Sequence, residues 1–62
     1  MLNLSELLLQ RHDMESFEEL KQAVRDKAAG GERFFRIDVR PPFPDTPENW
    51  EEVLESVFSG RV

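Results

Sequence analysis

Apolar and charged side chains alternate most clearly in the stretch from Phe34 to Arg40. The alternating residues are, in order, Phe35, Arg36, Ile37, Asp38, Val39 and Arg40. A period of two places the apolar side chains on one face and the charged ones on the other, which is typical of a half-buried β-strand. The pattern therefore predicts a strand over about residues 33–40. Pro41 and Pro42 end it, because proline has no N–H to donate to a ladder.

The leucine-rich start of the chain predicts a short helix over about residues 4–11. Asn3 and Ser5 compete as its N-cap, and leucine, glutamate and glutamine favour the helix. An alternative is a strand with Leu7 and Leu9 on one face, because short apolar runs are ambiguous. That alternative would create a strand–helix–strand unit within the chain.

The second helix is predicted over residues 17–29. Ser16 and Glu19 have the spacing of a capping box, in which each side chain meets the backbone N–H of the other residue. The expected apolar stripe consists of Phe17, Leu20, Ala23, Val24 and Ala28. Gly30 and Gly31 follow as the helix end, since glycine accepts the left-handed conformation that closes a helix.

The third helix is predicted from Pro47 to Ser59, with Thr46 as its N-cap and Gly60 after its end. Its apolar stripe comprises Trp50, Val53, Leu54, Val57 and Phe58. Residues 61–62 are expected to fray. Phe43, in the connection before this helix, is expected to fold back onto the core.

The predicted strand has no convincing partner strand elsewhere in the chain, yet its backbone groups need one. A domain of 62 residues is marginally stable alone, and a chain without cysteine has no disulfides to help it. We therefore predict the α+β class: a single domain over residues 1–62 in the order helix–helix–strand–helix. Its single strand pairs antiparallel across the two-fold axis of a homodimer.

Charge selects the register of this expected pairing. A two-fold axis at Asp38 would set Arg36 against Arg40 of the second copy and Asp38 against itself, which is unfavourable. An axis at Ile37 sets Arg36 against Asp38 instead. The residues of the expected dimer strand are Phe35, Arg36, Ile37, Asp38 and Val39.

Acidic residues outnumber basic ones, and the net charge is −5. This balance disfavours binding to nucleic acid, which requires an excess of lysine and arginine. Leu7-Leu8-Leu9 is too short for a signal peptide or a membrane span, so we expect no membrane contact and a cytoplasmic location.

No motif for catalysis, a metal or a cofactor is apparent, so we predict a protein that is not an enzyme. His12 is the only histidine and reads as a polar residue at a helix end. Pro41 and Pro44 have the P-x-x-P spacing of a proline-rich ligand, but a rigid connection between two elements is the preferred interpretation. The candidate partner-binding residues are Glu48, Glu51, Glu52 and Glu55 on the third helix.

The sequence thus favours a non-catalytic protein–protein interaction module, acting as a homodimer or as a small subunit of an assembly. The alternative is an acidic inhibitor resembling an antitoxin, which would bind a basic nuclease or nucleic-acid-binding protein through its glutamate-rich helix.

Overall fold

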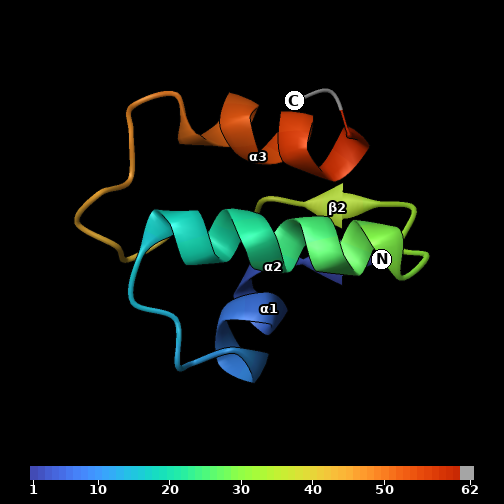
Figure 1. The fold of residues 1–62 in the computed structure, drawn as a ribbon, viewed down its shortest axis with the longest axis horizontal. Helices are drawn as coiled ribbons and strands as arrows, with labels where there is room; N and C mark the ends of the chain where they lie inside the picture. Colours follow the sequence, from blue (N-terminus) through green and yellow to red (C-terminus); the bar gives the residue numbers. More distant parts are fainter. Residues whose placement is uncertain (61–62) are drawn as a thin grey trace.

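The computed structural model describes residues 1–60 and has three helices and two short strands (Figure 1). In chain order these are β1 (Leu2–Asn3), α1 (Leu4–Gln10), α2 (Phe17–Ala29), β2 (Phe35–Arg36) and α3 (Trp50–Ser59). The predicted mixture of helix and strand is confirmed. The fraying expected for residues 61–62 lies outside the described residues.

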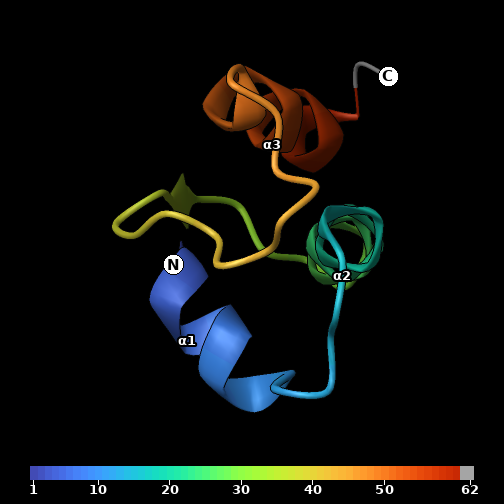
Figure 2. The same ribbon diagram turned by 90° about the vertical axis from the view of Figure 1, so that its left-hand side faces the viewer.

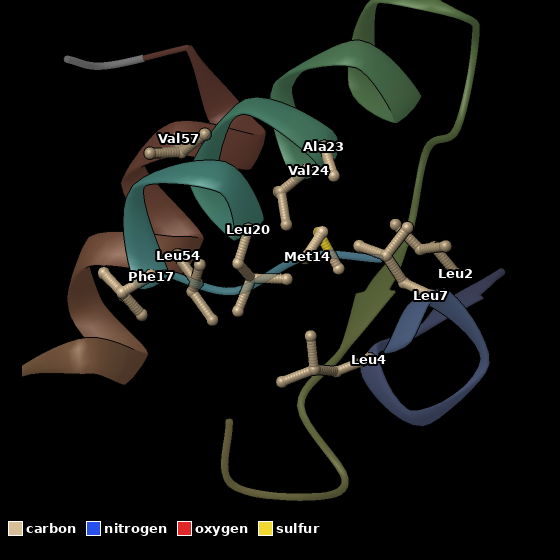
Figure 3. Packing of buried hydrophobic residues seen from close by; sticks show 10 residues of the cluster. All are labelled: Leu2, Leu4, Leu7, Met14, Phe17, Leu20, Ala23, Val24, Leu54 and Val57. Carbon is tan, nitrogen blue, oxygen red and sulfur yellow. The ribbon is translucent and has the colours of Figure 1, made fainter. Parts of the chain in front are cut away.

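Helix α2 is the central element of the fold. Figure 2 shows it end-on, with α3 above it, α1 below it and β2 across the core. Its apolar side chains meet those of α3 on one side and those of β1 and α1 on the other (Figure 3). The buried core consists of Leu2, Leu4, Leu7, Met14, Phe17, Leu20, Ala23, Val24, Leu54 and Val57. The helical periodicities of the sequence therefore identified most of the core.

Helix α2 has the predicted boundaries. The Ser16 hydroxyl accepts a hydrogen bond from the Glu19 N–H at 3.2 Å, which is one of the two bonds of the predicted capping box; within residues 1–60 the return bond from the Ser16 N–H to the Glu19 carboxylate is absent. After the helix, Gly31 adopts the left-handed conformation with φ of 107°. A side chain at Gly31 would be strained there, so the glycine has a backbone role.

Helix α1 also forms where predicted, and the alternative strand through Leu7 and Leu9 is wrong. Leu4 and Leu7 are fully buried, whereas Leu9 is 78% exposed on the outer side. Asn3 is the N-cap residue, but its side chain donates to the Glu6 carboxylate at 2.9 Å and makes no cap hydrogen bond.

The predicted start of α3 is wrong by three residues, because the helix begins at Trp50 with Asn49 as its N-cap. Thr46 lies in a preceding turn, where its N–H donates to the Phe43 carbonyl at 3.2 Å. The neighbouring Asp45 is hydrogen-bonded to the start of α2. These contacts hold residues 43–46 away from the helix axis and leave the Thr46 hydroxyl buried without a partner.

The prediction that the strand has no partner in its own chain is also wrong. Strand β2 is only two residues long and pairs in parallel with β1, with Leu2 beside Phe35 and Asn3 beside Arg36. The Leu2 N–H donates to the Phe34 carbonyl at 2.8 Å. The first residues of the chain are extended and lie beside β2, so no second copy is needed to give β2 a neighbour.

Candidate functional site

The five residues of the expected dimer strand do not form one continuous strand. Phe35 and Arg36 form β2, while residues 37–40 leave the ladder and the chain bends at Val39. Phe35 and Ile37 are half-buried against the core, and Arg36 and Asp38 are exposed. The predicted alternation of buried and exposed faces is therefore present over these four residues, although the regular strand is short.

Phe35 is attached to α3 through an aromatic contact. Its ring stacks on that of Phe58, with the centroids 5.2 Å apart and the planes at 25°. Offset stacking of this kind adds to the stabilisation that burial provides. It fixes the inner face of β2 against the C-terminal helix.

Asp38 serves the start of α1. Its carboxylate accepts from the Ser5 hydroxyl at 2.6 Å and from the Ser5 N–H at 3.0 Å. These two hydrogen bonds hold the pKa of Asp38 below its ordinary value of 3.8. The bond from the Ser5 hydroxyl is the larger cause, and the bond from the Ser5 N–H is the second. Because each carboxylate oxygen already accepts a hydrogen bond from Ser5, Arg36 of another copy would have to share Asp38 with Ser5, which the register argument did not include.

The outer edge of β2, the one away from β1, lies on the side of α3 (Figure 2). Along a strand, successive residues direct their backbone N–H and C=O groups to opposite sides. Since the Phe34 carbonyl faces β1, the backbone groups of Phe35 face away from β1, and those of Ile37 come just after the end of β2. Within residues 1–60 they have no backbone partner on that side. Unpaired backbone groups at the edge of a strand are potential hydrogen-bonding groups.

Exposed apolar side chains lie near the two ends of β2. Phe34 is 67% exposed, and Met1, its neighbour by the register of the sheet, is 74% exposed. Val39, just past the end of β2, is 39% exposed. We call Met1, Phe34, Val39 and the unpaired backbone groups of Phe35 and Ile37 the edge surface.

All four candidate partner-binding glutamates on or next to α3 are exposed. In the described part of the chain, ion pairs join other residues, and none includes Glu48, Glu51, Glu52 or Glu55. Glu52 differs from the other three, because it lines a groove between α2 and α3. The opposite wall of this groove carries Lys21 and Arg25.

His12 is exposed in the turn after α1. Nowhere in residues 1–60 do three or more histidine, cysteine, aspartate or glutamate side chains gather as they would around a metal ion. Among the same residues, no helix combines the length and the apolar character that crossing a membrane requires.

Two features of the site were absent from the sequence predictions. The groove brings together two helices whose packing no local pattern shows. The capping role of Asp38 joins residues 33 positions apart, so no nearby sequence signal could have shown it. Comparisons with known proteins identified no relative: the chain matches no protein-family model, no curated protein and no solved structure.

Proposed function

We propose that the protein is a non-catalytic interaction module that binds an extended protein segment along the edge surface. The observation that carries the proposal is the absence of backbone hydrogen bonds at Phe35 and Ile37 within residues 1–60, next to exposed Phe34 and Val39. Unpaired strand edges bind other chains readily, because backbone hydrogen bonds provide affinity without a specific side-chain match. A sheet of two short strands also gains most from an added strand.

A second copy of the chain is the first candidate for this segment, and a different subunit of an assembly is the other. In the antiparallel register centred on Ile37, Phe35 would lie opposite Val39 of the second copy. The Arg36–Asp38 contact between copies would contribute less than the sequence argument assigned to it, because Ser5 already uses both oxygens of the carboxylate. Burial of apolar side chains would then provide most of the driving force, at about 25 cal/mol per Å².

Sedimentation velocity from about 10 μM to about 1 mM tests self-association, since weak dimers populate in this range. Val39→Lys should weaken the dimer by at least about tenfold, because a lysine at the edge disfavours strand addition. Leu9→Lys is the matched control, as Leu9 is equally apolar, is 78% exposed and lies outside the edge surface on α1. A wild-type protein that stays monomeric at the highest concentration would exclude the homodimer and leave the hetero-assembly, to be tested by affinity capture from a native lysate.

The second candidate function is the acidic inhibitor, and it is supported by the exposure of all four glutamates. Their charges can steer and bind a basic protein, and such binding weakens with salt. Reversing the charge at Glu51 and Glu55 should abolish the binding of a basic nuclease, whereas the same change at Asp13 and Glu15 should have little effect. Equal effects of the two double variants would indicate attraction by net charge alone.

Both proposed functions include a cytoplasmic location, and cell fractionation tests this location.

A further inference from the structure

The groove between α2 and α3 is distinct from the edge surface and has a volume of about 270 Å³. One wall is formed by Lys21 and Arg25 of α2, and the other by side chains between Asn49 and Val57. Pockets for drug-sized ligands usually measure about 300–1,000 Å³. A ligand of this groove is therefore smaller than a nucleotide or a typical cofactor.

The positive charges of the groove come from one helix face. Lys21 and Arg25 are four residues apart, so they lie one turn from each other on the same side of α2. The Lys21 ammonium is 2.8 Å from the Glu18 carboxylate, which partly neutralises it. In residues 1–60, no carboxylate lies within ion-pair distance of Arg25. The Arg25 guanidinium is thus the cation that remains to bind a carboxylate, and its planar shape suits two parallel hydrogen bonds.

The rest of the groove combines apolar and hydrogen-bonding side chains. Val57 is buried and Val53 is half-buried, and both line the α3 wall. Asn49 and Ser56 line the same wall, and the Asn49 side chain makes no cap hydrogen bond. A cation at one side and an apolar surface beside it match a ligand with an anionic head and a short hydrocarbon tail.

We propose that this groove binds a small aliphatic carboxylate, with the carboxylate on Arg25 and the tail along Val53 and Val57. Glu52 is the one acidic side chain of the groove and repels such a ligand. The two charges therefore have opposite expected effects: Arg25→Gln weakens binding, and Glu52→Gln strengthens it. A nonspecific apolar contact would respond to neither substitution.

The test is a titration of ¹⁵N-labelled protein with sodium hexanoate, followed by two-dimensional NMR at constant ionic strength. We expect saturable shifts of the amides of Asn49, Val53 and Ser56, with a Kd of about 1 mM for so few ligand atoms. Arg25→Gln should raise the Kd by about tenfold. Glu52→Gln should lower it by about twofold to fivefold, as expected for the removal of an exposed like charge. Arg36→Gln is the matched control, an exposed arginine outside the groove, and should leave the Kd unchanged.

Three outcomes would overturn the assignment. If hexanol bound as tightly as hexanoate, the carboxylate would not be the recognised group. Shifts centred on Phe34 and Val39 would move the binding to the edge surface. A capped Leu–Glu–Leu peptide binding more than about tenfold tighter than hexanoate would identify the ligand as a partner's acidic side chain rather than a small molecule. Because Arg25 and Glu52 are both exposed, neither substitution threatens the fold.

Discussion

The starts of α1 and α2 differ from the start of α3 in how their free N–H groups are satisfied. At α1 the Ser5 N–H donates to Asp38, and at α2 the Phe17 N–H donates to Asp45 at 2.8 Å. At α3 the Asn49 side chain makes no cap hydrogen bond, and the Thr46 hydroxyl is buried without a partner. Among the described residues, α3 is therefore the one helix whose start receives no hydrogen bond from a side chain.

The difference shows that one connection supplies caps to two distant helices. Asp38 and Asp45 both lie between β2 and α3, and they reach residues 33 and 28 positions earlier in the chain. Each cap satisfies a helix end and also fixes one point of the connection. The geometry of this connection then determines where α3 can begin.

The largest expected effect tests whether α3 belongs to the core despite its uncapped start. Leu54 is fully buried, so Leu54→Ala should cost about 2–5 kcal/mol in the free energy of unfolding. A core of this size supplies about 3–5 kcal/mol in total, so we expect the variant to be largely unfolded. Urea unfolding, monitored by Trp50 fluorescence and circular dichroism, measures the free energy of unfolding of both proteins. Leu9→Ala, at an exposed position, should stay within about 0.5 kcal/mol, and an unchanged midpoint for Leu54→Ala would contradict the packing.

Removing the Asp45 contact at the start of α2, where Ser16 is the N-cap residue, should have the next largest effect. Asp45→Ala leaves the Phe17 N–H without its partner and should cost about 1 kcal/mol, as for other N-caps. Hydrogen exchange of the Phe17 amide should accelerate at the same time. Asp13→Ala removes an exposed carboxylate with only a long ion-pair contact, and it should change stability little. Equal effects of the two alanine variants would argue against a capping role for Asp45.

The contribution of Asp38 to stability, through its bonds to the start of α1, should depend on pH. Since hydrogen bonds from Ser5 lower the pKa of folded Asp38, its carboxylate stabilises the fold above pH 3.8, and this contribution is lost as the pH falls through the lowered value. The stability difference between wild type and Asp38→Asn should therefore shrink below pH 3.8. Ser5→Ala should raise the pKa of Asp38 toward 3.8 in an NMR titration. A pKa that does not move in this variant would show that the Ser5 hydroxyl is not the cause.

The smallest expected effect concerns Thr46. Thr46→Val replaces a buried hydroxyl that has no hydrogen-bond partner with a methyl group, so stability should stay constant or rise slightly. A functioning N-cap would instead lose about 1 kcal/mol on substitution. Thermal unfolding distinguishes these results, and a clear loss would remove the contrast between α3 and the other two helices.

Local patterns predicted the parts of the fold whose causes are local. Ser16 and the glycine pair flank α2, Glu19 lies in its first turn, and the helix has the bounds expected from these residues. Strand β1 was missed because two residues have no period, and it forms only through contact with β2. The register proposed from Arg36 and Asp38 could not include the competing bonds from Ser5, since these depend on the folded chain.

The residues of the candidate site also separate into those with local causes and those that depend on packing. The exposed glutamates and the two faces of residues 35–38 follow from periodicity, and both were predicted. The groove depends on the packing of α2 against α3, and Lys21 and Arg25 are outside the predicted apolar stripe of α2, so the sequence alone did not identify them as groove residues. Local sequence identified the exposed side chains, but not which of them lie opposite one another.

The pairing of β1 with β2 has a kinetic consequence. Bringing together Leu2 and Phe35, which are 33 positions apart, loses chain entropy, and a ladder of two residues per strand provides little stabilisation until the helices have packed. We therefore expect the ladder to form after the rate-limiting step of folding. Substitutions at Leu2 or Phe35 would then accelerate unfolding and leave the refolding rate nearly unchanged.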